Sequence, residues 1–568
     1  MIKKIKPVLT KGGISIKYSP NCYKYIKKII KLFTIEFYGF NDEIRIARAY
    51  KLYKKYNLLV VPKFGFLKFL NDPDTKKPFN KIGIYHEDGI VNKLYEREIT
   101  FKKKFKWSGK SNSYQKVVIK NVMENYFSED KLESGFAGVI LNLPTGHGKT
   151  YVAMGLIDKI RTTTLYICPT RKIANQVYKI MIKMFPELKI GIYHSDMKVY
   201  GNIIIGVIDS FSKSKKFIFI EKTNEHAVLA SGKLSKRFIT NRSTYSPKEF
   251  FEIWDLIIFD ECHNYCTEKN SNIFSRMSPR YTLGLSATPD NRQDSFDILC
   301  QWNIGPILNI NNIPNYLDIY IKDGDIPTFK GNVLGIKYHG PKNYTYNILD
   351  RKGAMIPYKM LEQLTDDPYR IELIIFIISL LNKKDYCILI FADRISYLRT
   401  LKEKLEKYNL CDKATILDDI PKKKKKVIQV TGGASDHDMN IAYTSANIIF
   451  TTYPFFKEGI SIPRINSIIY ATPKRYGYEQ TNGRCIRPSI LKNKENKKKE
   501  NDKVRIIVDI IDWDVRIQSQ WFTRKKAHKK MNDIGAKFKI KIFDINFDEL
   551  SNENFSSKFQ DFDLYIKD

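Results

Sequence analysis

The chain has 568 residues, of which 43% are hydrophobic and 28% are charged, so it carries enough apolar material for several buried cores. This length excludes a single small module and predicts about three or four domains, and the composition excludes global disorder. The net charge of +35 at pH 7 favours polyanionic partners such as nucleic acid or an anionic membrane surface. An AT-rich coding sequence would also enrich lysine, so the charge alone leaves nucleic-acid binding open.

The cysteines and the apolar runs indicate in which cellular compartment the protein is expected. The eight cysteines are scattered without a C-x-x-C pair, which predicts neither a disulfide framework nor a zinc ribbon and favours a reducing, intracellular compartment. The N-terminus lacks the apolar segment of a secretory signal, and the longest apolar run, 373–381, is far shorter than a membrane span. We therefore expect neither secretion nor insertion into a membrane.

The first part of the chain, residues 1–110, mixes helical and extended patterns. Apolar residues recur at helical spacing over 23–33, whereas 34–38 and 58–61 are typical of strands. We predict a small N-terminal α/β accessory domain in this part of the chain.

Two longer parts of the chain, 111–310 and 361–515, alternate short β-branched runs with amphipathic stretches, a pattern that is typical of parallel βα units. The predicted fold class is α/β, with two tandem doubly wound parallel-sheet domains. Residues 311–360, which contain several Pro and Gly residues, are predicted to be a linker. Residues 516–568 are predicted to be a C-terminal extension with an acidic tail.

Three lysine-rich segments interrupt this alternation: 211–250, 421–426 and 492–503. The first of them holds nine Lys or Arg residues against three acidic ones. Such runs are most often solvated loops. The alternative for 211–250 is that it lies along a nucleic-acid path.

A glycine-rich segment, Leu143-Pro-Thr-Gly-His-Gly-Lys-Thr150, follows the strand-like run 138–142 and opens a helical pattern over 151–160. This order of strand, loop and helix is the context that a phosphate-binding loop requires. Backbone N–H groups near the glycines would hold phosphates, Lys149 would neutralise them, and Thr150 would ligate Mg²⁺. The predicted nucleotide-binding residues are Thr145, Gly146, His147, Gly148, Lys149 and Thr150.

Two adjacent acids follow a second apolar run. The run 254–259 is typical of a buried strand and leads into Asp260-Glu261-Cys262-His263. Carboxylates at the carboxyl end of a parallel strand lie where ligands bind in such sheets. We expect Asp260 to hold Mg²⁺ through water and Glu261 to orient and deprotonate the attacking water.

From roughly Tyr114 to Asp514 the chain resembles superfamily 2 helicases of the DExH type, because further motifs appear in that family's order. Those of the first half are Pro169-Thr-Arg171, Val207-Ile-Asp-Ser210 and Ser286-Ala-Thr-Pro289. Those of the second half are Ile388-Leu-Ile-Phe-Ala-Asp393, Thr431-Gly-Gly433, Thr451-Thr-Tyr453, Glu458-Gly-Ile-Ser-Ile-Pro463 and Gln480-Thr-Asn-Gly-Arg484-Cys-Ile-Arg487. The last of them matches Q-x-x-G-R-x-x-R in full.

The resemblance implies two RecA-like domains that bind ATP and Mg²⁺ at a hydrolytic site between them. It implies that Gln480 lies near the attacking water and that Arg484 and Arg487 act as arginine fingers, which adds these three to the catalytic pair Asp260 and Glu261. The residues implied to couple the ATP site to movement are His263, Ser286 and Thr288. The implied nucleic-acid contacts are Thr170, Arg171, Ser210, Gly432, Gly433, Thr451 and Thr452.

Within this superfamily, the stretches 302–306, 469–473 and 508–512 resemble the branch that contains XPB, UvsW and the poxvirus-type transcript-release helicases. Tyr114-Gln115 is similar to that branch's adenine-contacting glutamine, which adds Gln115 to the predicted nucleotide site. The branch implies duplex DNA as substrate, 3′ to 5′ tracking and a role in transcription or repair, with the transcription machinery as a partner. The composition further suggests a large DNA virus, and hence the virion core and the host cytoplasm.

Three alternative functions stay open. One is an RNA helicase, because contacts to phosphates follow the backbone and do not depend on the base. Another is a nucleic-acid-binding scaffold with little ATPase activity, against which the intact Lys149, Glu261 and Arg487 argue. The third is a restriction-enzyme translocase subunit, although the sequence shows no convincing cluster of nuclease carboxylates. Leu143 and Ser461 depart from the family pattern, which usually has a small residue and an aspartate at these positions.

Overall fold

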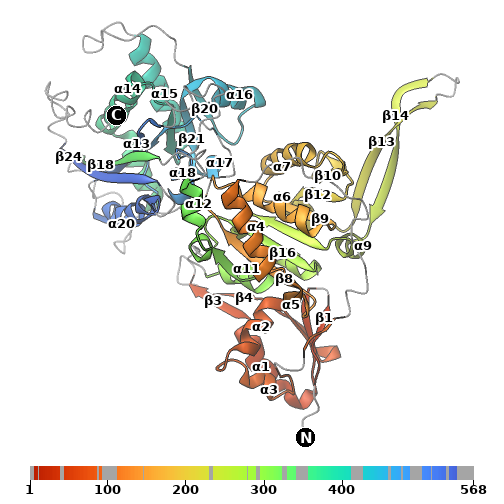
Figure 1. Ribbon diagram of the computed structural model, residues 1–568. Coiled ribbons are helices and arrows are strands. Elements are labelled where there is room, and N and C mark those ends of the chain that lie inside the picture. The colour runs from red at the N-terminus through yellow and green to blue at the C-terminus, as the bar shows by residue number, and fades with distance from the viewer. Residues whose placement is uncertain are drawn as a thin grey trace. The chain divides into compact units, whose positions relative to one another are not determined.

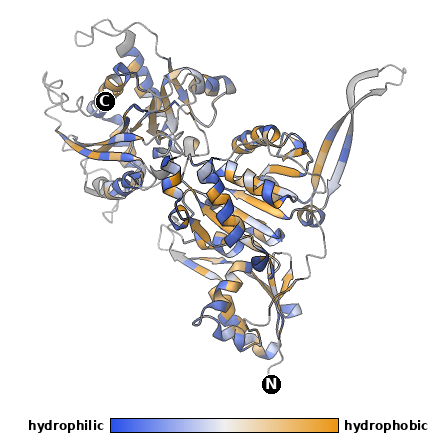
Figure 2. Ribbon diagram, viewed as in Figure 1, coloured by the Kyte–Doolittle hydropathy of each residue, from blue (hydrophilic) through white to orange (hydrophobic). Residues whose placement is uncertain are grey.

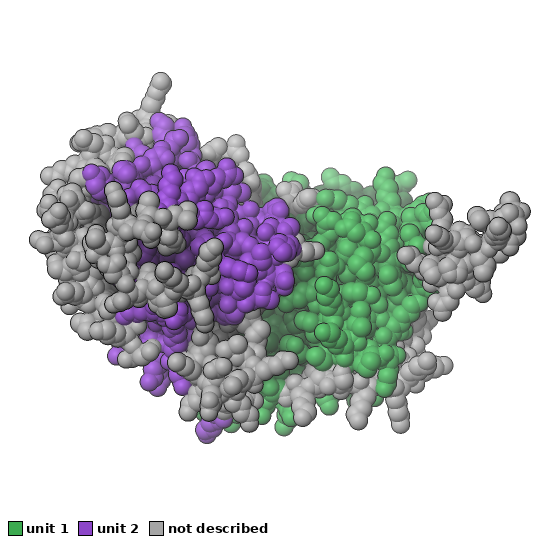
Figure 3. All heavy atoms as spheres, turned by 90° about the horizontal axis from the view of Figure 1, so that it is seen from above, with its two compact units in different colours: residues 1–320 green, residues 321–568 purple. Residues whose placement is uncertain are grey.

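The computed structural model describes the chain in segments: 5–10, 12–38, 44–85, 89–92, 112–144, 146–228, 234–277, 279–289, 295–322, 329–340, 356–410, 426–457, 462, 464–474, 478–486, 502–512, 515–532 and 536–546. The chain divides into two compact units, residues 1–320 and 321–568 (Figure 3). Within these segments no helix is long and apolar enough to span a lipid bilayer.

The N-terminal part of the first unit is a mixed sheet with helices beside it. Its strands in spatial order are β5 (Lys51–Tyr53), β6 (Leu58–Val61), β2 (Gly13–Lys17), β1 (Val8–Thr10) and β7 (Val91–Asn92). The other elements are α1 (Tyr23–Leu32), the hairpin β3 (Thr34–Tyr38) and β4 (Ile44–Arg48), α2 (Lys63–Asn71) and α3 (Lys77–Asn80). Helix α1 forms because Ile26 and Ile29 share the buried face while its lysines stay exposed.

This N-terminal part shares one hydrophobic core with the sheet that follows it. The rings of Phe33 and Phe69 meet Trp302 of α11 (Asp297–Ile304) edge-on, with centroids 5.5 and 5.6 Å apart. A Cβ at Gly138 would lie 1.9 Å from the Ile304 carbonyl oxygen and 2.6 Å from the Phe64 ring, so this close approach requires glycine. Residues 5–92 therefore pack on the first parallel sheet as a continuous body.

The large sheet of the first unit is parallel except at one edge. Its strands in spatial order are β11 (Lys198–Val199), β10 (Ile190–Tyr193), β12 (Ile203–Val207), β9 (Thr164–Cys168), β15 (Leu256–Asp260), β16 (Tyr281–Ser286), β8 (Ala137–Asn142) and β17 (Ile307–Asn309). Every residue of β9, β12 and β15 is buried, as expected for strands covered on both faces, and most of their residues are apolar, in keeping with the hydrophobic strands of this part of the fold (Figure 2).

Helices and short turns connect and flank these strands. They are α4 (Ser113–Asn125), α5 (Glu129–Leu132), α6 (Lys149–Ile160), α7 (Arg171–Met184), α8 (Ile208–Ser212), α9 (Pro247–Glu252), η4 (Cys262–Tyr265), α10 (Glu268–Ser271), η5 (Asn272–Arg276), α11 and α12 (Tyr316–Lys322). A long antiparallel hairpin, β13 (Phe217–Val228) and β14 (Leu234–Tyr245), projects away from the large sheet (Figure 1).

The second unit is built on a sheet in which every strand pairing is parallel. Its strands in spatial order are β20 (Lys426–Val430), β21 (Ala446–Thr452), β19 (Ile388–Ala392), β22 (Ser467–Tyr470), β23 (Arg505–Asp512), β18 (Lys330–His339) and β24 (Lys537–Asn546). Its helices include α13 (Pro357–Asp366), α14 (Pro368–Lys383), α15 (Ile395–Leu410), α16 (Asp436–Thr444), α17 (Tyr453–Lys457), α18 (Tyr478–Asn482) and α20 (Val515–Lys529). The predicted fold class, two tandem α/β domains with parallel sheets, is confirmed.

Two strands of this sheet come from segments that the sequence places outside the domain. Strand β18 lies in the predicted linker 311–360, and β24 lies in the predicted C-terminal extension 516–568. The glycines of β18 leave room for aromatic rings: a Cβ at Gly331 would lie 2.3 Å from the Phe538 ring, and one at Gly335 would lie 3.2 Å from Trp521. These glycines are packing positions inside the fold and do not mark a flexible connection.

Candidate active site

The predicted phosphate loop lies at the carboxyl edge of the first parallel sheet, between β8 and α6. Gly146 and Gly148 have φ angles of +94° and +73°, which favour glycine, and helix α6 begins directly after them at Lys149. The first N–H groups of a helix have no intrahelical acceptor and favour an anion in front of them. The loop therefore has the backbone form of a phosphate cradle. Thr145 lies outside the described residues.

Lys149 reaches across this loop toward the paired acids. Its Nζ donates to the Leu143 carbonyl oxygen at 3.3 Å and lies 3.9 Å from Oε1 of Glu261. Its side chain is mostly buried. The fold thus brings the predicted phosphate-binding lysine close to the predicted catalytic base, although the two residues are 112 positions apart in the sequence.

The first of the paired acids, Asp260, ends strand β15, and Glu261 follows it directly before η4. Asp260 is buried, and its Oδ1 accepts the backbone N–H of Glu261 at 3.1 Å. Burial raises the pKa of the Asp260 carboxyl and Glu261 raises it further, while Lys149 acts in the opposite direction. Glu261 itself has a φ of +48°, an uncommon conformation for a residue other than glycine. One of its carboxylate oxygens, Oε2, is buried and accepts no hydrogen bond from the described part of the chain.

The residues predicted to hold Mg²⁺ are compatible with that ion. Burial raises the pKa of the Tyr166 hydroxyl, Asp260 raises it further and Thr150 lowers it, so both predicted ligands lie within interaction range of one hydroxyl. Within the described segments, no group of three or more His, Cys, Asp or Glu residues could hold a metal ion. Mg²⁺ usually keeps several waters and takes one or two protein ligands together with substrate phosphates, so Asp260 and Thr150 suffice.

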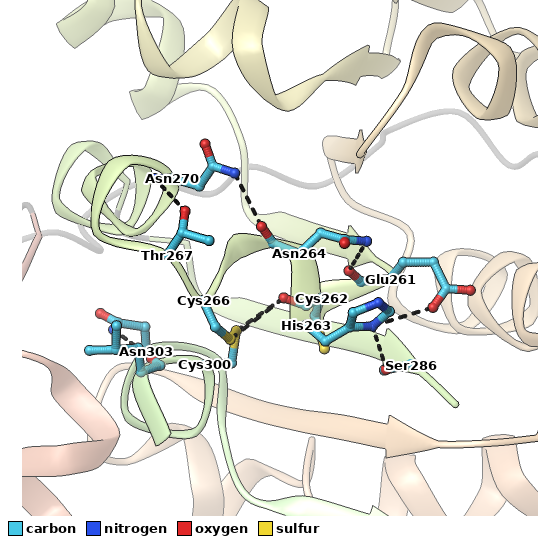
Figure 4. Close-up of a disulfide and its surroundings, with 11 residues drawn as sticks. Glu261, Cys262, His263, Asn264, Cys266, Thr267, Asn270, Ser286, Cys300 and Asn303 are labelled. Carbon is cyan, nitrogen blue, oxygen red and sulfur yellow. Dashed lines mark hydrogen bonds and ion pairs between the residues drawn. A yellow bond between two sulfur atoms is a disulfide. The ribbon is translucent and has the colours of Figure 1, made fainter. Parts of the chain in front are cut away.

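The predicted coupling residues form one hydrogen-bonded group. Nδ1 of His263 lies 2.9 Å from Oγ of Ser286 and 3.6 Å from Oε2 of Glu261 (Figure 4). The Ser286 hydroxyl oxygen also accepts the backbone N–H of Thr288 at 3.0 Å. His263 therefore connects the end of β15 with the end of the neighbouring strand β16.

A disulfide joins Cys266 to Cys300 just beyond this group (Figure 4). It corrects the expectation that the cysteines form no disulfide framework, although only one bond is involved among the described residues. The two sulfurs lie 34 residues apart in sequence and meet because η4 packs against α11. The spacing of the two cysteines does not predict this pair, because packing between distant segments brings the two sulfurs together.

Gln115 lies beneath the phosphate loop. Its Oε1 accepts the backbone N–H of Asn112 at 3.1 Å, closing a capping box at the start of α4. A Cβ at Gly148 would lie 2.2 Å from Nε2 of Gln115, so the amide packs directly on the loop backbone. No sequence motif predicts a role for Tyr316 and Tyr320 of α12, yet their rings contact the ring of His147 in the loop.

The nucleic-acid contacts predicted in the first unit lie on α7 and α8. Thr170 caps α7 by accepting the Ile173 N–H at 3.5 Å. Arg171 is exposed and pairs with Asp196 at 2.9 Å. Ser210 lies on α8, directly before the hairpin.

The residues predicted in the second unit are placed as follows. Gly432 and Gly433 lie in an exposed turn after β20, whereas Thr451 is buried and donates to the Val430 carbonyl oxygen at 2.8 Å. Thr452 ends β21, Gln480 lies on α18, and Arg484 is buried. Arg487 and Ser461 lie outside the described residues.

Comparisons with known proteins show what this chain is similar to. The family model of the res subunit of type III restriction enzymes matches residues 108–291. The "Putative ATP-dependent RNA helicase QP509L" of African swine fever virus is 28% identical over 414 residues, covering 70% of each chain. The "Putative ATP-dependent RNA helicase L396" of Acanthamoeba polyphaga mimivirus is 23% identical over 488 residues, covering 86% of this chain and 76% of that one. The crystal structure of T4 UvsW aligns at 16% identity with a TM-score of 0.32, covering 96% of this chain and all of that one.

A phosphate loop and paired acids on one parallel sheet, followed by a second parallel α/β domain, define a P-loop nucleoside triphosphatase. The chain resembles superfamily 2 helicases, and it is similar to proteins of large DNA viruses that are named as putative ATP-dependent helicases.

Proposed function

We propose that this helicase hydrolyses ATP at the carboxyl edge of its first sheet and uses the energy to move along or unwind duplex DNA. The observation that supports the hydrolytic step is the carboxylate of Glu261. Among the described residues its Oε2 is buried and accepts no hydrogen bond, with His263 Nδ1 3.6 Å away, and its Oε1 lies 3.9 Å from the Lys149 ammonium. A carboxylate held in this way can accept a proton from water beside the bound phosphates.

Each residue of the site has a distinct task in this proposal. The N–H groups at the start of α6 and Lys149 bind the β and γ phosphates, and Glu261 orients the water and takes its proton. Asp260 and Thr150 hold Mg²⁺, which neutralises phosphate charge when bound. Gln480, Arg484 and Arg487 act on the attacking water and on the charge of the transition state. The other contacts predicted for nucleic acid, on α7 and α8 and in the turn after β20, bind phosphates, whereas Thr451 is buried and donates to the Val430 carbonyl oxygen.

Two observations favour different polymers. The branch resemblance favours duplex DNA, whereas the relatives from African swine fever virus and mimivirus are named as RNA helicases. An RNA helicase is therefore the second candidate function, and only contacts to a 2′-hydroxyl would distinguish the two polymers.

ATPase assays with matched polymers test this proposal. We expect duplex or branched DNA to stimulate ATP hydrolysis more than single-stranded DNA or RNA at the same salt concentration. The measurement is phosphate release with each polymer at equal nucleotide concentration and without polymer. If RNA stimulates ATP hydrolysis most strongly, the chain is an RNA helicase and the proposal of a DNA substrate fails. If no polymer gives hydrolysis, the alternative of a nucleic-acid-binding scaffold stands.

The hairpin β13–β14 is the part of the first unit most suited to reach a polymer. At about 3.3 Å per residue, its 12-residue strands extend about 40 Å. Its root is rigid, because the ring of Phe217 stacks on Phe250 with centroids 4.0 Å apart. The guanidinium of Arg276 also donates to the carbonyl oxygens of Phe211, Ser212 and Ser214 at 2.6 to 2.8 Å. We propose that lysine and arginine side chains of this hairpin contact the phosphates of a bound nucleic acid.

Removing the exposed cations at the root of the hairpin tests this proposal. We expect replacement of Lys215, Lys216, Arg242 and Lys248 by Ser to weaken binding to every DNA sequence, because phosphate contacts carry no sequence information. The slope of log affinity against log salt should become shallower by roughly two to four, at about 0.9 per lost phosphate contact. Fluorescence anisotropy of a labelled duplex over a salt series measures both effects.

The control variant replaces four exposed lysines of the N-terminal part, Lys68, Lys76, Lys77 and Lys81, by Ser. It removes the same number of positive charges from the same unit, and its salt slope should stay that of the unchanged protein. Equal salt slopes for the hairpin variant and the control would show that the hairpin does not contact nucleic acid and that its lysines are only solvated.

The finer expectations from the sequence stay proposals. They are the transcription machinery as a partner, the virion core and host cytoplasm as compartments, and the segment boundaries near 110 and 310. A deletion of residues 1–100 cannot test whether the N-terminal part acts as a separate accessory domain. Because Phe33, Phe64 and Phe69 pack against α11 and β8, the deletion would expose the core of the ATP-binding sheet.

A further inference from the structure

His147, the residue between the two loop glycines, is held by aromatic side chains. Its ring stacks on Tyr320 with centroids 4.1 Å apart and planes inclined by 6°, and its Nδ1 lies 2.7 Å from the Tyr316 hydroxyl oxygen. Tyr114 meets Tyr320 edge-on at 5.0 Å and Tyr316 edge-on at 6.0 Å. We call these four residues the tyrosine clasp.

The clasp holds an uncharged imidazole. Burial, helped by the neighbouring charge of Lys149, lowers the pKa of His147 to about 3, so the ring is neutral at physiological pH. The ring is almost fully buried, with one face against Tyr320 and Nδ1 engaged by Tyr316. It therefore adds no positive charge for phosphates, and its contribution to the loop is mechanical.

The clasp joins three separate segments of the first unit. Tyr114 lies in the first turn of α4, next to Gln115, whose amide packs on Gly148. His147 belongs to the phosphate loop. Tyr316 and Tyr320 belong to α12, and the first unit ends at residue 320, so the chain leaves this unit through that helix. A shift of the loop must either carry α12 with it or break the stack and the hydrogen bond, since close-packed rings do not deform continuously.

We propose that Tyr316 and Tyr320 are positioning residues that tie the phosphate loop to α12, so that the nucleotide state of the loop is transmitted to the segment entering the second unit. This inference rests on the proposed ATP site. It concerns coupling and not the hydrolytic step, because neither tyrosine belongs to the predicted catalytic set.

The first test separates coupling from catalysis in the full-length chain. We expect Tyr320→Leu to keep the basal kcat without polymer within about threefold, and to lose fivefold or more of the polymer-stimulated rate, which is within the usual range of coupling energies. Tyr320→Phe keeps the stacked ring and should restore the stimulation. Tyr316→Phe removes only the hydroxyl and should give a partial loss. Equal losses of the basal and stimulated rates, or no loss in Tyr320→Leu, would mean that the clasp is ordinary core packing.

A second test needs no polymer and so distinguishes failure of this inference from failure of the proposed helicase function. Hydrogen exchange of the amides of 316–322 is followed with and without Mg·ATP, using Glu261→Gln to prevent turnover. We expect nucleotide to protect this helix when Tyr320 is present, and the protection to disappear in Tyr320→Leu and return in Tyr320→Phe. If ATP protects the phosphate loop but leaves 316–322 unchanged, the coupling is overturned even though the ATP site stands.

Discussion

Replacing Lys149 by Ala is expected to weaken ATP binding and abolish hydrolysis, whereas Glu261→Gln should bind ATP nearly normally and fail to turn it over. In the proposed function Lys149 makes a charge-assisted contact to the phosphates, and such contacts are worth about 1.5–3 kcal/mol, or roughly 10- to 100-fold in affinity. Glu261 is the proposed general base, and loss of such a base typically costs about 10²- to 10⁴-fold in rate. The two side chains face each other at 3.9 Å, yet the expected phenotypes differ.

Nucleotide affinity and single-turnover hydrolysis, measured separately, distinguish these outcomes. The control is Lys120→Ala on α4, which removes an exposed lysine whose only described ion pair is with Glu124 one turn away. That substitution should leave both quantities unchanged. Near-normal turnover in Glu261→Gln would show that the general base is a different group. Normal ATP affinity in Lys149→Ala would show that this lysine does not contact the phosphates.

Arg370→Leu is expected to destabilise the second unit by about 3–5 kcal/mol, the usual cost of leaving one member of a buried ion pair without its partner. The Arg370 side chain is fully buried, and it donates through Nε and Nη2 to the two carboxylate oxygens of Asp512 at 2.7 and 3.2 Å. It also donates to the Ala471 carbonyl oxygen at 2.7 Å. These contacts tie α14 to the ends of β22 and β23.

The same helix start is held by a second carboxylate. Asp367 caps α14 by accepting the N–H groups of Tyr369 and Arg370, and it also accepts the hydroxyl of Tyr338 on β18. Loss of Arg370 thus leaves Asp512 charged in a buried site while the helix remains attached. The penalty should appear as a lower midpoint of chemical unfolding, and scanning calorimetry of the full chain can assign it to one transition.

An exposed ion pair on the same helix serves as the control. Glu372 pairs with Lys404 of α15, and both side chains are more than a third exposed. Lys404→Leu should therefore change stability by less than about 1 kcal/mol. The double variant Arg370→Leu with Asp512→Leu should recover part of the loss, because it removes the uncompensated charge. A loss below about 1 kcal/mol in Arg370→Leu would contradict a structural role for the pair.

Most of the site was predictable because its residues follow rules that operate over short distances along the chain. Gly146 and Gly148 stand where the backbone needs positive φ, and Asp260 and Glu261 end a run of buried β-branched and aromatic residues. A parallel sheet places the carboxyl ends of its strands at one edge, so a motif after each strand implies a shared site. His263 and Ser286 meet for that reason.

The residues that escaped prediction are joined by contacts between distant segments. Tyr316 and Tyr320 reach His147 from about 170 residues away, and ordinary tyrosines carry no local signal for such a contact. Cys266 and Cys300 meet only because η4 packs on α11. Gly331 and Gly335 suggested a linker, although they leave room for Phe538 and Trp521 inside the second sheet.

The sequence by itself determined the class of fold, the order of the motifs and the chemistry that those residue types can perform, because strand periodicity and motif spacing are local properties of the chain. The tertiary structure alone decided how far each domain extends: β18 and β24 complete the second sheet, and residues 5–92 share the core of the first. It also decided that the ring of His147 faces α12. Side-chain packing between remote segments determines these features, and the free energy of such packing depends on neighbours that only the folded chain brings together.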